Sequence, residues 1–256
     1  MNRLYINRLS VLKGLGPIDA RSIGRDALLR WVILLPLFIA VMVRWFLPIL
    51  LGRAEAILNF DLMPYYRPLM AYVLLLLVPD LVGFVTGFLL LDQRDDRTLY
   101  ALQVTPLSLN GYLVYRLAMP VLLSFLLSLV VLPLSGLVPL NGALLVIAAV
   151  SAAPMAPIFA LALAALSQNK VQGFALMKVS GIVLLPPLAA YFIHSDWQLL
   201  LGLVPTYWPA KTIWAALDWV NGGSPGPMWF YLLVGLAYQL FCLLLLARRF
   251  NHIMHR

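Results

Sequence analysis

Five charged residues stand together between two long apolar runs, within the stretch LDQRDDRTLYALQVTPLS at 91–108. They are Asp92, Arg94, Asp95, Asp96 and Arg97. Helix-forming residues follow them, and Thr105 and Pro106 end that segment. Acidic residues interact favourably with a helix N-terminus, and Leu99 and Leu102 share one helix face. The sequence therefore predicts a short amphipathic helix, which is either a docking element for a soluble partner or a solvated hairpin tip.

The overall composition is that of a polytopic membrane protein. Of the 256 residues, 63% are hydrophobic and 11% are charged, whereas a soluble domain carries about 25% charged residues. The net charge of +8 fits the enrichment of Lys and Arg in cytoplasmic loops, so we expect no nucleic-acid partner. A single cysteine, Cys242, excludes an internal disulfide, and no metal site is expected.

Six apolar stretches approach or exceed the length of about 20 residues that a bilayer span needs. We expect spans at 30–51, 68–91, 112–135, 141–166, 178–193 and 229–247. Pro186-Pro187 should break or kink the fifth. The apolar region 196–217 contains Pro205 and Pro209, so a re-entrant or interfacial segment is favoured over a seventh span. Trp208, Trp214 and Trp219, within and just after this region, are interpreted as interfacial anchors.

The basic residues orient these spans. With the N-terminus in the cytosol, 14 of the 18 Lys and Arg residues fall in the N-terminal segment, the cytoplasmic loops and the tail, and only Arg53, Arg67 and Lys211 fall outside. This bias predicts a multi-pass protein of the plasma membrane with both termini cytoplasmic. The sequence thus predicts one all-α domain over 1–256, with six transmembrane helices. Residues 1–29 form either an amphipathic helix on the inner leaflet or a merely basic lead-in.

Two charged side chains fall inside the predicted spans. Arg44 and Asp80 each cost at least about 2.5 kcal/mol at the centre of an isolated helix. Their expected offset of about 7–8 Å can be partly bridged by an Arg side chain, so we predict an Arg44–Asp80 pair, with snorkelling of Arg44 as the alternative. Gly83 and Gly87 form a small-residue face suited to close helix packing.

The string DQRDDRTLYALQVTPLS, followed by Tyr112 and Arg116, resembles the first intracellular loop of type-2 ATP-binding-cassette (ABC) exporter permeases. The opening GPIDARSIGRDALLRW at 16–31 is similar to a subgroup of fluoroquinolone or drug export permeases. The resemblance implies six spans with cytoplasmic ends, an amphipathic connecting helix before the first, and a re-entrant region between the fifth and sixth. It also implies a coupling helix that docks on a separate ATPase, with the contact residues Asp92, Arg94, Asp95, Asp96, Arg97, Thr98, Leu99, Leu102, Val104, Thr105 and Pro106.

Arg97 departs from the family pattern, which has a small residue, commonly Gly, at this position. Either the local turn needs no positive φ here, or the partner offers an acid to Arg97.

The chain contains no G-x-x-x-x-G-K-[ST] phosphate-binding loop, so we expect a permease subunit and not an enzyme. ATP and Mg would bind to the partner ATPase, and a second permease chain, identical or different, would complete the transporter within the membrane lipid. The apolar spans suit amphipathic or lipophilic cargo. The alternatives are a secondary transporter, for which only Asp80 offers a titratable group at mid-span, and a non-transporting assembly protein.

Overall fold

The computed structural model describes residues 27–58, 61–95, 109–137, 139–193 and 195–254, and within these ranges its regular elements are helices. Six segments are long and apolar enough to cross a membrane: Leu34–Ile57, Pro64–Arg94, Arg116–Ser135, Gly142–Leu166, Lys170–Phe192 and Gly226–His252. The prediction of an all-α protein with six spans is therefore confirmed. The expected amphipathic lead-in and most of the expected coupling helix lie outside the described residues.

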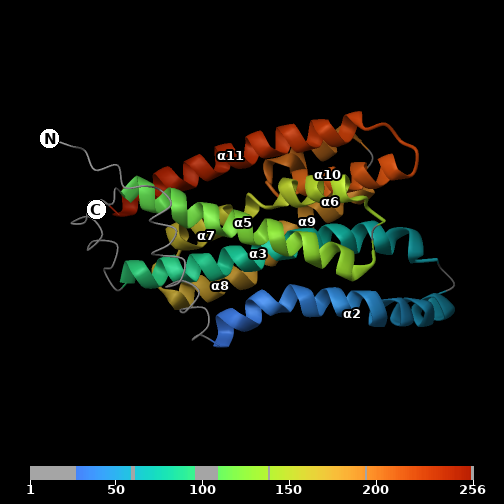
Figure 1. Cartoon of the computed structure of the whole chain (residues 1–256), viewed down its shortest axis with the longest axis horizontal. Coiled ribbons are helices and arrows are strands. Elements are labelled where there is room, and N and C mark those ends of the chain that lie inside the picture. Colours follow the sequence, from blue (N-terminus) through green and yellow to red (C-terminus); the bar gives the residue numbers. More distant parts are fainter. Residues whose placement is uncertain (1–26, 59–60, 96–108, 138, 194, 255–256) are drawn as a thin grey trace.

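Four of the six spans are single helices and two are interrupted. The single helices are α2 (Ala27–Leu58), α3 (Met63–Asp95), α5 (Leu109–Ser135) and α11 (Gly226–Met254). The fourth span consists of α6 (Gly142–Ala152) and α7 (Met155–Leu166), and the fifth of α8 (Lys170–Ser180), the 3₁₀ helix η1 (Gly181–Leu184) and α9 (Leu185–Phe192). In Figure 1, α2 begins and α11 ends at the same end of the bundle. We call it the predicted cytoplasmic end and its opposite the predicted outer end.

The fourth span bends where the sequence places Pro154 and Pro157. Pro154 has no N–H to continue the hydrogen bonds of α6, so the helix stops at Ala152 and restarts as α7. At this bend the side chain of Gln239 in α11 donates through Nε2 to the buried Ser151 carbonyl at 3.0 Å. The bend thus exposes a carbonyl that binds the sixth span to the fourth.

The fifth span begins at Lys170 and not at 178 as expected. Asn169 caps α8, because its side chain accepts a hydrogen bond from Gln172 N at 3.0 Å. This polar cap and the two lysines lowered the apparent hydropathy of the first turns. Pro186 and Pro187 fall in the first turn of α9, where proline is tolerated, so the proline pair divides this span as predicted.

Between the fifth and sixth spans the chain turns back into the bundle. The 3₁₀ helix η2 (Asp196–Leu203) leads to a turn, and α10 (Tyr207–Val220) leads out again. At the turn, Thr206 Oγ1 donates to Val183 O at 2.6 Å, and Tyr238 OH donates to Leu203 O at 2.5 Å. Tyr238 lies about 18 Å along α11 from Gly226. The turn is therefore near mid-span, as a re-entrant segment requires, and α10 with 14 residues is too short for a seventh span.

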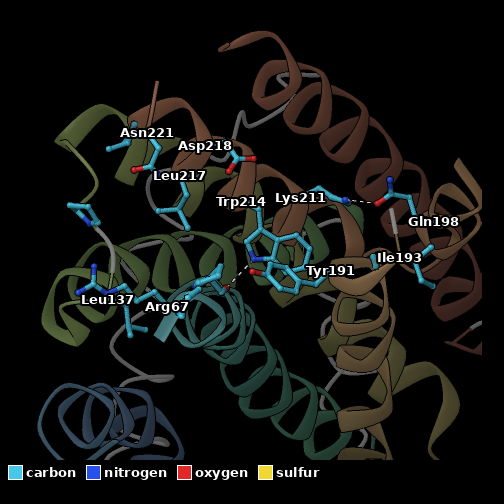
Figure 2. A pocket seen from close by; sticks show the side chains of 15 residues that line it. Arg67, Leu137, Tyr191, Ile193, Gln198, Lys211, Trp214, Leu217, Asp218 and Asn221 are labelled. Atoms are coloured by element: carbon cyan, nitrogen blue, oxygen red, sulfur yellow. Dashed lines mark hydrogen bonds between the residues drawn. The ribbon is translucent and has the colours of Figure 1, made fainter. Parts of the chain in front are cut away.

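Of the three tryptophans that were expected to be interfacial anchors, Trp208 and Trp214 pack against other helices of the bundle. The Trp214 side chain is 8% exposed and donates through Nε1 to Pro68 O at 2.9 Å (Figure 2). Trp208 covers Gly235 of α11, where an added Cβ would lie 2.6 Å from Trp208 Cβ. Only Trp219 among them has an exposed side chain. The hairpin formed by η2 and α10 thus contacts both α3 and α11.

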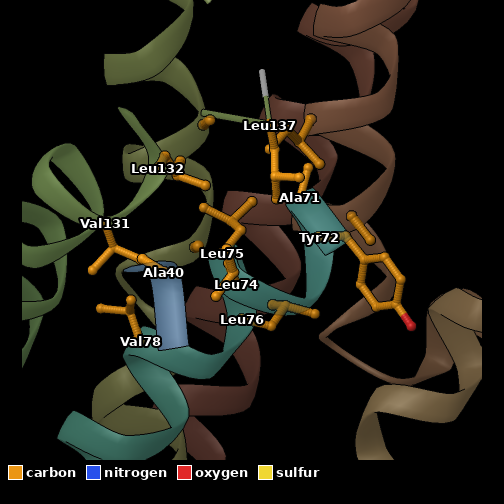
Figure 3. Close-up of a cluster of buried hydrophobic side chains, with 14 of the residues drawn as sticks. Ala40, Ala71, Tyr72, Leu74, Leu75, Leu76, Val78, Val131, Leu132 and Leu137 are labelled. Carbon is orange, nitrogen blue, oxygen red and sulfur yellow. The ribbon is translucent and has the colours of Figure 1, made fainter. Parts of the chain in front are cut away.

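The main buried cluster surrounds the outer half of α3. Figure 3 shows Leu74, Leu75 and Val78 of α3 against Ala40 of α2 and Val131 of α5, all fully buried or nearly so. Helix α3 also contacts α6, α7, α8 and α10. It is therefore the central helix of the bundle, and its position decides that of the others.

Gly83 and Gly87 lie at the contact between α3 and α7. A Cβ at Gly83 would lie 2.6 Å from both Ala156 O and Phe159 Cβ, and one at Gly87 would lie 2.7 Å from a Leu163 methyl group. The two backbones approach so closely that only hydrogen fits. The predicted small-residue face thus packs on α7, which sequence spacing alone did not identify as its neighbour.

Replacing Gly83 by Ala should lower the free energy of unfolding by about 1–3 kcal/mol, because the obstructing atoms include the α7 backbone. The matched control is Gly52→Ala in α2, where no atom lies within 4 Å of the added Cβ. That change should be neutral or stabilising by up to about 1 kcal/mol, since Ala favours a helix interior. Unfolding of the purified chain in detergent measures both, and equal effects would contradict the α3–α7 contact.

Candidate functional site

The predicted cytoplasmic end of α3 carries the first residues of the charged stretch. Asp92 Oδ1 forms an ion pair with Lys170 Nζ of α8 at 2.7 Å. Both side chains are partly exposed, so this pair contributes little to stability by itself. It does place the first turn of α8 beside the last turns of α3.

Arg94 binds the C-terminal end of α7. Its guanidinium donates to Ala164 O and Ser167 O, each at 3.0 Å, and to Gln168 O at 2.7 Å. The last carbonyls of a helix have no partner within that helix and carry partial negative charge, so a cation with several N–H donors satisfies both needs. Arg94 therefore joins α3 to the connection between α7 and α8.

Two of the predicted coupling residues contact other spans of the same chain. Asp92 and Arg94 bind the fourth and fifth spans, and Asp95 is the last residue of α3. The other predicted coupling residues, from Asp96 to Pro106, lie outside the described residues. Their contact with an ATPase stays a prediction. The charged stretch nonetheless leaves α3 at a point that is bound to two other spans.

The predicted Arg44–Asp80 pair is not formed. Arg44 lies at the predicted outer end, where its Nη1 donates to Leu134 O of α5 at 3.3 Å. The neighbouring residue Val43 faces α3, because Val43 O accepts a hydrogen bond from Tyr66 OH at 3.0 Å. Asp80 lies about 21 Å farther along α3 than Tyr66. The expected offset assumed that the outer ends of the first two spans are level, whereas the contact between Val43 and Tyr66 places Arg44 beside the first turns of α3.

Asp80 is half-buried on the side of α3 that faces the fifth span. Its carboxylate lies within hydrogen-bonding reach of the Ser180 hydroxyl at the end of α8. Ser180 Oγ also lies 2.7 Å from Met177 O. Asp80 is thus held by α8 at mid-span, and its partner is a hydroxyl and not a cation.

A pocket of about 850 Å³ opens at the predicted outer end, and we call it the outer pocket. It lies where α3 begins, beside α9, η2, α10 and the connection from α5 to α6. Its polar and aromatic lining residues are Arg67, Tyr191, Gln198, Lys211, Trp214, Asp218 and Asn221 (Figure 2). This volume is in the range of small-molecule sites, which span roughly 300–1,000 Å³.

Lys211 is the half-buried cation of the outer pocket. Its Nζ donates to Gln198 Oε1 at 2.5 Å and lies 5.8–5.9 Å from the ring centroids of Tyr207, Trp214 and Tyr231. Burial lowers the pKa of Lys211, and the negative charge of Asp218 acts in the opposite direction. Aromatic faces stabilise an ammonium group that has lost part of its water.

The sequence did not indicate the outer pocket. Lys211 is one of the few basic residues expected outside, and Trp214 was expected to be an anchor in the lipid interface. A signal was present, because Lys211, Trp214 and Asp218 follow the spacing of one helix face within an otherwise apolar segment. The walls supplied by α3 and α9 have no such signal, since they come from distant parts of the chain.

Replacing Arg94 by Gln should lower the free energy of unfolding by about 1–2 kcal/mol, because Gln cannot satisfy three carbonyls at once. Backbone amides around 164–172 should also exchange hydrogen faster. Arg53→Gln, at an exposed position of α2, is the control and should change stability by less than about 0.5 kcal/mol. Unchanged exchange at 164–172 would show that Arg94 does not bind this connection.

Arg44→Gln and Asp80→Asn should have additive effects on stability. Residues without shared partners add to within about 0.5 kcal/mol, and here the partners are Leu134 and Ser180. A double-mutant cycle on unfolding in detergent measures this. A coupling energy above about 1 kcal/mol would show that Arg44 and Asp80 interact, in contradiction to the structure.

Comparison with known proteins places this arrangement in a family. The model described as fluoroquinolones export permease protein Rv2686c-like matches residues 19–247. Two fluoroquinolones export permease proteins of Mycobacterium tuberculosis, MT2760 (strain CDC 1551 / Oshkosh) and Rv2686c (strain ATCC 25618 / H37Rv), are each 32% identical over 243 residues, which cover 94% of this chain and 94% of each relative. No solved structure matches. The resemblance to drug export permeases is confirmed, and the chain belongs to the Rv2686c-like family of fluoroquinolones export permease proteins.

Proposed function

We propose that this export permease is the transmembrane subunit of an ATP-driven exporter of amphipathic or lipophilic small molecules. A separate ABC ATPase would bind ATP and Mg, and a second permease chain would complete the pathway. The names of the two relatives make fluoroquinolones the first cargo to test. The proposed orientation places both termini and the ATPase in the cytosol, in agreement with the distribution of Lys and Arg.

The observation that carries this proposal is the attachment of the charged stretch to three spans. Arg94 and Asp92 bind the α7–α8 connection just before the chain continues into the expected coupling helix. A push on that helix would reach α3 directly, and α7 and α8 through these contacts. Such an arrangement can convert closure of an ATPase into a tilt of several spans together.

The outward surfaces of the bundle support a lipid environment and a second permease chain. Long apolar side chains are exposed on α2, α5 and α11, among them Phe38, Leu122 and Leu240, each more than 50% exposed. Exposed apolar surface on this scale requires lipid or protein cover. Within α3, by contrast, 72% of the apolar window is buried. The second chain would therefore pack on the outer helices and leave the α3 core intact.

The proposal is tested by purifying the chain from its own membranes in mild detergent and measuring ATP hydrolysis in the product. An ATP-binding subunit should co-purify. The triple variant Asp95→Lys, Asp96→Lys, Leu102→Glu should lose most of this subunit, because it reverses the charge and polarity of the expected docking helix.

The matched control is Asp196→Lys, a charge reversal at an exposed position of η2 at the predicted outer end, which should leave assembly unchanged. Recovery of a stable permease without any ATPase would contradict the proposal. Export that collapses with the proton gradient but continues without ATP would identify a secondary transporter instead.

A further inference from the structure

The outer pocket has the form of a binding site for a ligand with charges at both ends. Lys211, Trp214 and Asp218 lie on one face of α10, so that Lys211 and Asp218 are about 10 Å apart along the helix axis. Lys211 is on the side nearer the mid-span turn, and Asp218 is nearer the outer end of α10. In Figure 2 the rings of Trp214 and Tyr191 lie together below α10, the helix that carries Lys211 and Asp218.

The aromatic wall of the pocket is fixed before any ligand arrives. The Trp214 indole is held by its hydrogen bond to Pro68 O at 2.9 Å and by edge-to-face contacts with Tyr72 and Tyr191, at centroid distances of 5.3 and 5.1 Å. These contacts come from three elements, α3, α9 and α10. A wall that is already rigid loses little conformational entropy when a planar ring packs against it.

The charges of the pocket favour an anionic group. Its lining carries two cations, Arg67 and Lys211, and one acid, Asp218. The ammonium of Lys211 has three N–H donors, of which Gln198 takes one among the described contacts. A carboxylate at this position would accept a charge-assisted hydrogen bond in a partly desolvated site, where such bonds are strong.

We propose that the outer pocket binds a planar aromatic carboxylate, with the carboxylate at Lys211, the ring system against Trp214 and Tyr191, and any basic amine of the ligand at Asp218. This inference deepens the proposed function and rests on it, because it names the chemical class of the cargo and a site on its exit path. Fluoroquinolones belong to this class, since they carry a carboxylate on a fused ring and, in many members, an amine at the opposite end.

The test is direct binding of ciprofloxacin to the purified full-length chain, without ATP, followed by the fluorescence of the drug. Lys211→Gln should weaken binding about tenfold, since it removes the charge but keeps a group that can bond to Gln198. Lys211→Arg should retain most of the affinity. Lys178→Gln, the same change at an exposed lysine of α8 outside the pocket, is the matched control and should leave binding unchanged.

Chemical variants of the probe separate a direct contact from a structural effect. The methyl ester of ciprofloxacin should bind wild type and Lys211→Gln equally, because it has no carboxylate for Lys211 to hold. Asp218→Asn should weaken ciprofloxacin but not its N-acetyl derivative, which has lost the basic amine. Equal affinity of wild type and Lys211→Gln for ciprofloxacin would overturn the proposal, and so would an equal loss for acid and ester.

The binding and export experiments can fail independently, so the ligand assignment of the outer pocket and the proposed exporter function are tested separately. If ciprofloxacin binds as described but no ATPase co-purifies, the pocket assignment stands and the proposed function fails. If ATP-driven export of ciprofloxacin is undiminished in Lys211→Gln, the exporter stands and the pocket assignment fails.

Discussion

The close contact between α3 and α7 is the constraint on which the rest of the structure depends. In a bilayer, helices gain no hydrophobic free energy by association, so they must be held by dense packing and hydrogen bonds. Gly83 and Gly87 allow the two backbones to meet, with Ala156 and Ala160 opposite them. This contact fixes the C-terminal end of α7 beside Arg94, and Arg94 then satisfies the carbonyls there. The C-terminal end of α7, which lies beyond the kink in the fourth span, is therefore bound to α3.

Helix α3 connects the two regions that could do chemistry or mechanical work. At the predicted cytoplasmic end it binds the α7–α8 connection through Arg94, and at the predicted outer end its Pro68 carbonyl binds Trp214 in the wall of the outer pocket. Pro68 and Pro79 lie inside α3 and each removes one backbone N–H donor, but the helix is continuous from Met63 to Asp95. The α10 hairpin extends this connection to α11 through Tyr238. One helix, α3, therefore contributes both to the outer pocket and to the charged stretch.

Much of the fold was predictable because it depends on local sequence. Six spans follow from apolar length, the division of the fourth and fifth spans from their prolines, and the return of the chain after the fifth from Pro205 and Pro209. The start of the fifth span was missed, since the Asn169 cap and two lysines mask its first turns. The site was less predictable. Asp92 and Arg94 stood out by charge, but their partners at Lys170 and the end of α7 come from residues 70 or more positions later.

By itself the sequence determined which segments enter the membrane, where helices break, and which charges are concentrated at one end, because hydropathy, proline geometry and Lys/Arg bias act within a few residues. Only the tertiary structure decided which faces meet. It separated Arg44 from Asp80, placed α7 against the glycines of α3, and gathered Arg67, Tyr191, Lys211 and Trp214 around one pocket. The physical reason is that a helix presents a different face with every residue, so neighbours depend on the register and rotation of whole helices, which packing across the entire bundle sets.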